Sequence, residues 1–398
     1  MISKNALSTK DRYTARGVSA TKDEVHKATS KLDKGLYPKT FCKILPDIAA
    51  HDPAWCNILH ADTAGTKSAL AYLYWRETGD LSVWKGIAQD AIVMNMDDMA
   101  CVGCTEHFML SNTIARNRHV ITGDVIQAVI EGTIAFCEQM ASFQIDIHHA
   151  GGETADVGDI VRTIDVGFTA FSRMQREELV INRIRHGDVI VGLASDGQST
   201  YEAAYNSGIG SNGLTSARHD VLHKMYGERY PESYSEHTEQ EYVYSGSKNL
   251  TDKVDVRGVP MEVGKLLLSP TRTYLPVLRT ILRELHSEIH GIIHNTGSGQ
   301  TKVRRFLQDG ICVVKDGLPE CPPVFNLIQS ESGTSWEEMY QVFNMGCRME
   351  IYVPPHIANE VIAMAHAYNI NAWVIGRVEK AETSSVLLET KQGTFRYS

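Results

Sequence analysis

Strand-like and helix-like spacings of apolar residues alternate along the first half of the chain. A short apolar run that ends in Asp62 predicts a buried strand, and a helical pattern follows it. In the next helical pattern Asp90 and Asp97 stand seven residues apart, so they share one face of that helix. The elements expected in this half are strands at 57–62 and 160–170 and helices at 68–77, 84–102 and 124–142, after an irregular arm at 1–22.

The second half continues this alternation. Strands are expected at 188–193, 290–294, 349–353 and 372–378, and helices at 271–285, 302–307, 335–343 and 356–368. Pro276 lies inside the first of these helices, so we expect a kink there. Ser335 stands three residues before Glu338 in a capping box that starts a helix. Residues 226–258 are polar and lack a period, which predicts an exposed insertion; a mobile lid is one role it would suit.

The length of 398 residues accommodates two domains, and the patterns place them at 1–173 and 174–398. A net charge of −9 argues against a nucleic acid partner, because binding to nucleic acid relies on clustered Lys and Arg. We find neither the apolar core of a signal peptide nor an apolar run of transmembrane length. The eight cysteines show no disulfide framework. These features predict a cytoplasmic protein without a membrane partner.

One pattern with chemical potential occurs twice, at 58–67 and 145–156: an apolar strand followed by an acid, small residues and hydroxyls. Carboxylates bind Mg²⁺, glycines let backbone N–H groups approach anionic oxygens, and a lysine balances phosphate charge. The residues concerned are Asp62, Gly65, Thr66 and Lys67 in the first copy and Gly151, Gly152, Glu153 and Thr154 in the second. The pattern favours an Mg-nucleotide enzyme, although each copy could also be an ordinary turn.

Three further segments offer candidate chemistry. Asp97 and Asp98 are adjacent acids among apolar residues, which is costly unless a cation or hydrogen-bond donors compensate; alternatively, one acid faces solvent. The glycine-containing segment 294–301 lies between a strand and a helical pattern, which suits an anion site or a tight turn. Cys101 and Cys104 form a single Cys-x-x-Cys, and we interpret them as two small buried residues.

Taken together, these segments resemble the phosphoribosylformylglycinamidine cyclo-ligase family, also called aminoimidazole ribonucleotide synthetase. Residues 343–346 are identical to the family's Phe-Asn-Met-Gly, and 151–155 match its Gly-Gly-Glu-Thr-Ala. The other similar segments, in chain order, are 13–18, 62–67, 97–98, 211–213, 268–274 and 294–299. The matches are collinear over nearly the whole chain.

The resemblance implies an α/β (α+β) fold of two domains. The N-terminal domain would bind ATP and form a homodimer, and the C-terminal domain would contact substrate and phosphate. The implied reaction uses ATP and Mg²⁺ to convert formylglycinamidine ribonucleotide, through an iminophosphate, to aminoimidazole ribonucleotide in purine biosynthesis. The implied metal ligands are Asp62, Asp97, Asp98 and Glu153; ATP or phosphate would meet these and Gly65, Thr66, Lys67, Gly151, Gly152 and Thr154. The implied substrate residues are Ser211, Asn212, Arg272, His294, Thr296, Gly297, Gly299 and Asn344.

The chain departs from the family pattern at three places. The glycine-rich N-terminal stretch is replaced at 36–41, the Ala and Pro of Asp-x4-Gly-Ala-x-Pro are Cys104 and Glu106, and the histidine before Ser-Asn-Gly is Gly210. These departures leave open a sister activity of the same superfamily: selenophosphate synthetase, thiamine-monophosphate kinase or the hydrogenase-maturation dehydratase. They also leave open a paralogue that binds a nucleotide without catalysis.

Overall fold

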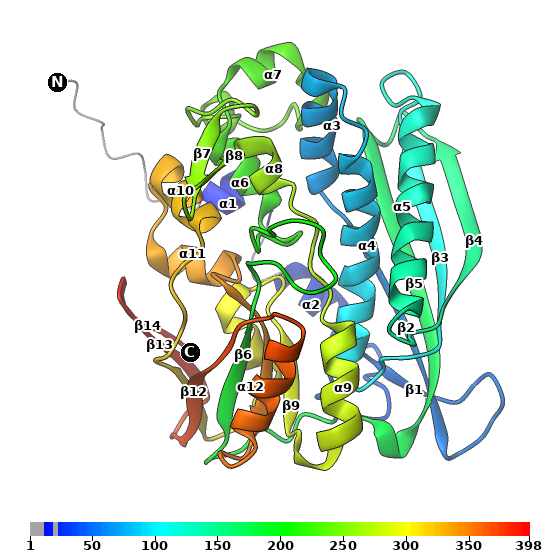
Figure 1. Ribbon diagram of the computed structural model, residues 1–398, viewed down its shortest axis with the longest axis vertical. Coiled ribbons are helices and arrows are strands. Elements are labelled where there is room, and N and C mark those ends of the chain that lie inside the picture. The colour runs from blue at the N-terminus through cyan, green and yellow to red at the C-terminus, as the bar shows by residue number, and fades with distance from the viewer. Residues whose placement is uncertain (1–11, 19–22) are drawn as a thin grey trace.

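The computed structural model describes residues 12–18 and 23–398, and contains two large sheets (Figure 1). The first has the order β1(Ile44–Pro46)-β2(Trp55–Thr63)-β5(Ile164–Gln175)-β3(Phe108–Arg116)-β4(Ile147–Asp156). The second has the order β14(Gly393–Tyr397)-β13(Ser385–Thr390)-β10(Ile311–Lys315)-β12(Ala372–Lys380)-β6(Val189–Ala194)-β11(Cys347–Val353)-β9(Gly291–His294). The predicted α/β (α+β) class is therefore confirmed, while the division at residue 173 stays a prediction.

The helices of the first half are α3(Lys67–Thr78), α4(Val83–Ala100) and α5(Gly123–Ala141), after the short α1(Arg12–Ala15) and α2(Asp23–Thr29). Those of the second half are α6(Leu214–Val221), α7(Met225–Arg229), α8(Val263–Leu267), α9(Leu275–Leu285), α10(Pro323–Ser332), α11(Trp336–Val342) and α12(Ala358–Ala367). Strands β7(Lys253–Val256) and β8(Val259–Glu262) form a separate two-stranded sheet. The element η5(Gly299–Phe306) is a 3₁₀ helix. No helix in the described part of the chain is long and apolar enough to cross a membrane.

Helix α4 is the central element, since it packs on β2 and β5, on α3 and α5, and on α9 of the second half. Most of its residues are buried, including the acids Asp90, Asp97 and Asp98. A helix that is apolar on most sides must be enclosed, which explains its place between the two halves of the chain. Its buried acids therefore need partners from neighbouring elements.

Within the described residues, the first sheet is covered on one face only. Along β3, buried and exposed residues alternate, as expected for a strand with one face toward a core. Leu59 and Met109 on the other face are 59% and 49% exposed, and both pair with Phe171 of the strand between them. This open face thus carries a row of apolar side chains across three strands.

The predicted kink at Pro276 is wrong. Helix α9 begins at Leu275, so Pro276 lies in its first turn, where the missing N–H costs no hydrogen bond. The preceding residues are not helical, because the backbone N–H groups of Thr271 and Tyr274 donate to Asp90 and Asp97 of α4. Tertiary hydrogen bonds thus set the start of this helix.

The expectation that 226–258 is exposed is only partly correct, because many of its residues are exposed but the segment also contains buried tyrosines. Tyr226, Tyr230, Tyr242 and Tyr244 are buried, and Tyr244 lies 4.4 Å, centroid to centroid, from the ring of His219. Tyrosine supplies a large apolar ring with one polar atom, so a segment rich in it can pack while appearing polar. The interpretation as a mobile lid stays a prediction.

Several local predictions are confirmed and others need adjustment. The Ser335 side chain accepts a hydrogen bond from the N–H of Glu338 at the start of α11, as the capping box predicts. The strand expected from residue 160 begins only at Ile164, and the helix expected at 302–307 is η5. Part of the irregular arm expected at 1–22 lies outside the described residues; within it, Arg12–Ala15 forms a helical turn.

Candidate active site

A polar cavity of about 210 Å³ lies where the two halves of the chain meet. The first half contributes Asp62 from the end of β2 and Asp98 from α4. The second half contributes residues after β9 and from η5. The lining residues are Tyr13, Asp62, Met94, Asp98, Asn212, Thr296, Gly297, Ser298, Lys302, Arg305, Gln341 and Val342. The cavity therefore brings together five of the residues predicted from the sequence: Asp62, Asp98, Asn212, Thr296 and Gly297.

Asp98 is held as an anion at this cavity by two histidines. Its Oδ1 lies 2.7 Å from Nδ1 of His294, and its Oδ2 lies 3.5 Å from Nε2 of His60. Burial alone would raise the pKa of Asp98, but the hydrogen bond with His294 and the charges of His294, His60 and Lys302 lower it overall. Asp98 is therefore a carboxylate at neutral pH, in keeping with the expectation that a buried acid needs compensating groups.

Two basic residues on η5 complete the cavity. A 3₁₀ helix has three residues per turn, so Lys302 and Arg305 project to the same side. Nζ of Lys302 lies 3.4 Å from Oγ1 of Thr296, and Nη2 of Arg305 lies 3.3 Å from Oγ of Ser298. The sequence analysis missed both residues. The signal was present in the basic run that follows the glycine-containing segment, since Arg304 is also basic.

Two predicted site residues, Asp97 and Lys67, instead join the two halves of the chain. Fully buried Asp97 accepts hydrogen bonds from the Thr273 hydroxyl (2.7 Å) and the Tyr274 N–H (3.0 Å), and burial raises its pKa. Buried Lys67 donates to Asp90 (2.8 Å) and to the carbonyl of Ser269 (2.6 Å).

Arg272 is likewise enclosed. It donates to Glu202 and to the carbonyls of Ala194 and Asp196, the latter two at 3.0 Å. Its guanidinium is thus occupied by internal partners, and like Lys67 and Asp97 it is absent from the cavity lining.

The second copy of the acid–glycine pattern lies elsewhere. Gly151, Gly152, Glu153 and Thr154 are on β4, where Glu153 is exposed and pairs with Thr113. Strands β5 and β3 lie between β2 and β4, so Asp62 and Glu153 are about 14 Å apart at ordinary strand spacing. The four expected metal ligands therefore do not converge within one chain. In the described ranges, no group of three or more His, Cys, Asp or Glu residues could hold a metal ion.

The cavity nevertheless fits Mg²⁺ delivered with a nucleotide. Mg²⁺ commonly takes one or two protein carboxylates and completes its coordination with phosphate oxygens and water. Asp62 and Asp98 line the same cavity and supply such a pair. The donor chemistry is that of a metal–phosphate site rather than of a closed protein cage.

The other predicted residues lie near the cavity or in its walls. The Thr66 hydroxyl is 2.8 Å from that of Thr215, and exposed Gly65 has a φ of +60°. Gly299 has no room for a side chain, because a Cβ there would lie 2.5 Å from the carbonyl oxygens of Tyr340 and Phe343.

Ser211 and Asn344 line a small recess beside the cavity, with Met94, Ile209, Gly210, Asn212, Asn295, Thr296, Phe343 and Arg348.

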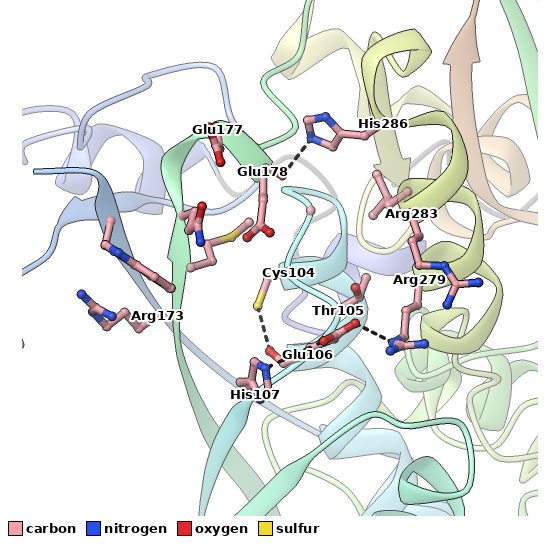
Figure 2. Close-up of a pocket in the computed structure, with 15 residues that line it drawn as sticks. Cys104, Thr105, Glu106, His107, Arg173, Glu177, Glu178, Arg279, Arg283 and His286 are labelled. Carbon is pink, nitrogen blue, oxygen red and sulfur yellow. Dashed lines mark hydrogen bonds and ion pairs between the residues drawn. The ribbon is translucent and has the colours of Figure 1, made fainter. Parts of the chain in front are cut away.

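A larger cavity of about 510 Å³ lies between the end of the first sheet and α9 (Figure 2). Its wall includes the altered loop at 103–107, but none of the predicted site residues lines it. Several of its charges are paired: Arg279 lies 2.6 Å from Glu106, and Arg283 lies 3.2 Å from Glu284. His286 lies 2.9 Å from the carbonyl oxygen of Glu178. Burial raises the pKa of Cys104 to about 12, which disfavours thiolate chemistry. Cys101 and Cys104 are both buried, as predicted.

Comparison with known proteins decides the family. The model described as "AIR synthase related protein, N-terminal domain" matches residues 46–174, and the corresponding C-terminal domain matches 185–389. The chain belongs to the AIR synthase related protein family. The resemblance identified from the sequence motifs is therefore confirmed, and AIR synthase related domains account for both halves of the chain.

Relatives with assigned names agree with this membership. The chain is 30% identical to the phosphoribosylformylglycinamidine cyclo-ligase of Methanocaldococcus jannaschii, over 81% of this chain and 77% of the relative. It is 29% identical to the Methanococcus vannielii protein of the same name, over 81% and 77% of the two chains. The expectation of an enzyme is confirmed, because these relatives are named as ligases.

Solved structures support the fold. The T. maritima PurL complexed with ADP has a TM-score of 0.52 at 13% identity, over 96% of this chain and 50% of that chain. The chain thus spans about half the length of PurL. AaThiL complexed with AMPPCP and TMP has a TM-score of 0.52 at 10% identity, over 94% and 95% of the two chains. At these identities the likeness concerns the fold alone.

Proposed function

We propose that this enzyme is an ATP-dependent cyclo-ligase that converts formylglycinamidine ribonucleotide to aminoimidazole ribonucleotide, with release of ADP and phosphate. The observation that carries the proposal is that Asp62, Asp98, Lys302 and Arg305 line one cavity, in a chain of this family. The relatives named as cyclo-ligases give the reaction, and the cavity supplies groups suited to a metal-bound phosphate chain.

The triphosphate of ATP is placed, in this proposal, between the acidic and basic walls. Asp62 and Asp98 would hold Mg²⁺, which when bound neutralises phosphate charge. Lys302 and Arg305 would bind phosphate oxygens and stabilise the charge that develops on the transferring phosphoryl group. His294 keeps Asp98 ionised and fixed in place through the 2.7 Å contact.

The ribonucleotide would extend from this cavity toward Ser211, Asn212 and Asn344. Transfer of the γ-phosphoryl group to the formamide oxygen forms a P–O bond and releases ADP. The neighbouring amine nitrogen of the same substrate then attacks the formamide carbon and loses a proton. The C–O bond breaks, phosphate leaves, and the imidazole ring is closed. The protein's contribution is mainly to orient the two substrates and to stabilise charge.

We also propose a homodimer in the cytoplasm. The open face of the first sheet, with Leu59 and Met109, is an apolar surface that a second copy could cover. Strand β4, with Glu153, lies at the edge of that sheet and could approach a partner. All eight cysteines are free thiols, which supports a reducing compartment.

The proposal is tested by incubating the purified chain with formylglycinamidine ribonucleotide, ATP and Mg²⁺. Formation of aminoimidazole ribonucleotide in equal amount with ADP is the expected result. ADP release with a phosphorylated but uncyclised product would instead indicate a kinase-like sister activity. ATP binding without ADP release would indicate a non-catalytic paralogue, and either result overturns the cyclo-ligase assignment.

A further inference from the structure

The recess beside the cavity contains a buried cation, Arg348. The volume of the recess, about 10 Å³, is close to the space that one water molecule requires. It adjoins the cavity, because Met94, Asn212 and Thr296 line both. The recess can thus accept one oxygen-sized group from a molecule bound in the cavity, whereas a phosphate group is too large for it.

The guanidinium of Arg348 is only partly satisfied. Arg348 is 3% exposed; its Nη2 donates to the carbonyl of Arg272 and lies 3.9 Å from Asp97. Its Nε is buried and has no hydrogen-bond partner among the described residues. Arginine carries five N–H donors, and leaving such donors unsatisfied inside a protein is costly. Because Arg348 lines the recess, an acceptor that enters it with a ligand would add a partner for this guanidinium.

Gly210 faces the same guanidinium. A Cβ on Gly210 would lie 3.2 Å from Nη1 of Arg348 and 3.9 Å from Nδ2 of Asn344. The φ of +73° at Gly210 further disfavours a side chain there. The family pattern has a histidine at position 210. In this chain Arg348 of β11, instead of a side chain at position 210, lines the recess there.

We propose that Arg348 is a substrate-binding residue that donates to one uncharged oxygen of the ribonucleotide, a carbonyl or hydroxyl oxygen, in the recess beside the cavity. The proposal rests on the proposed function for the identity of the ribonucleotide. It assigns Arg348 the place that a side chain at position 210 would otherwise occupy.

The test compares the wild type with Arg348→Met and Arg348→Lys. Methionine keeps much of the length but removes the charge and the donors, whereas lysine keeps the charge and loses the planar fork. Binding of formylglycinamidine ribonucleotide without ATP is measured by calorimetry, and KM is measured separately for each substrate. We expect Arg348→Met to weaken ribonucleotide binding about 10- to 100-fold, the usual effect of losing a charge-assisted hydrogen bond, with ATP KM within about 2-fold. Arg348→Lys should fall in between.

Arg218 provides a matched control. It is also buried, and its Nε has no hydrogen-bond partner in the part of the chain that the structure describes. Its guanidinium lies over Tyr244 at 5.5 Å, as that of Arg348 lies over Tyr274 at 5.3 Å. It lines neither the cavity nor the recess. Arg218→Met should therefore lower the thermal stability without changing the ribonucleotide affinity of the folded fraction.

The outcomes separate this proposal from the cyclo-ligase assignment. Unchanged ribonucleotide affinity in Arg348→Met, or equal losses for ribonucleotide and ATP, overturns the role of Arg348. A wild type that does not bind the ribonucleotide overturns it as well. A wild type that binds the ribonucleotide and loses affinity in Arg348→Met, yet makes no imidazole product, supports the role of Arg348 while the cyclo-ligase assignment fails.

Discussion

Nδ1 of His294 lies 2.7 Å from Oδ1 of Asp98, and this contact joins β9 of the second half of the chain to α4 of the first. The contact helps to lower the pKa of Asp98 in spite of burial, so a carboxylate persists at the cavity. The neighbouring Asp97 has a raised pKa and no place in the cavity lining. Adjacent acids on one helix thus have opposite pKa shifts because they point to different partners.

Asp98→Asn should weaken the binding of the Mg²⁺ that the reaction requires. The change removes the charge that faces the cavity but little volume, so the fold should persist. We expect the apparent Mg²⁺ affinity to fall at least about 10-fold, as measured by titrating Mg²⁺ at saturating ATP. An Mg²⁺ titration that superimposes on that of the wild type would show that Asp98 does not contribute to the metal site.

Asp97→Asn should act on stability instead. The amide cannot replace both acceptor oxygens that face Thr273 and Tyr274, so the link between α4 and the start of α9 weakens. We expect the free energy of unfolding in urea to fall by about 1–3 kcal/mol. The apparent Mg²⁺ affinity of the remaining folded enzyme should stay within about 2-fold of that of the wild type. Asp98→Asn is the comparison, and a reversed pattern in the two variants would refute the division of roles.

Lys302→Met should raise the KM for ATP by about 10-fold, because a cation opposite the carboxylates is lost. Arg304→Met is the matched control: Arg304 is exposed, donates to the carbonyl of Ser398, and is absent from the cavity lining. Steady-state kinetics with ATP as the varied substrate separates the two variants. Similar KM values for ATP in both would exclude a phosphate-binding role for Lys302.

His219 should make the stability depend on pH. Burial, with the charges of Arg218 and Arg16, lowers its pKa well below its usual value, so it is neutral in the folded state. The unfolded chain takes up this proton below about pH 6.5, so the contribution of His219 is present above that pH and is lost as the pH falls. The expected slope is about 1.4 kcal/mol per pH unit for this one proton.

The His219 contribution is measured by urea unfolding at pH 7.5, 6.5 and 5.5 for the wild type and His219→Gln. Glutamine does not titrate, so the variant should lose less stability between pH 6.5 and 5.5. Identical slopes for the two proteins would mean that His219 is protonated in the folded state.

The sequence predicted the main elements because their apolar periods reflect one-sided or complete burial. Helix α4 and strands β2, β6 and β11 were found on this basis. Strands β1, β3, β7, β8, β10, β13 and β14 were not predicted. The start of α9 was predicted four residues too early, because this boundary depends on Asp90 and Asp97, which are distant in sequence.

The candidate site was predicted less completely for a related reason. Spacing identifies a carboxylate or a lysine but not its partner. Lys67 and Arg272 were expected to meet ligands, but Asp90 and Glu202 bind them inside the protein. Asp62 and Asp98 line one cavity, and their role as metal ligands stays a prediction. Lys302, Arg305 and Arg348 became evident only when η5 and β11 were seen beside it.

The most direct test of the account is a crystal structure of the chain with a non-hydrolysable ATP analogue and Mg²⁺. The account predicts a cation within about 2.1 Å of an oxygen of Asp62 or Asp98, the distance typical of Mg²⁺ ligands, with phosphate oxygens facing Lys302 and Arg305. A nucleotide whose phosphates lie in the cavity of Figure 2, or whose cation contacts neither Asp62 nor Asp98, would contradict it.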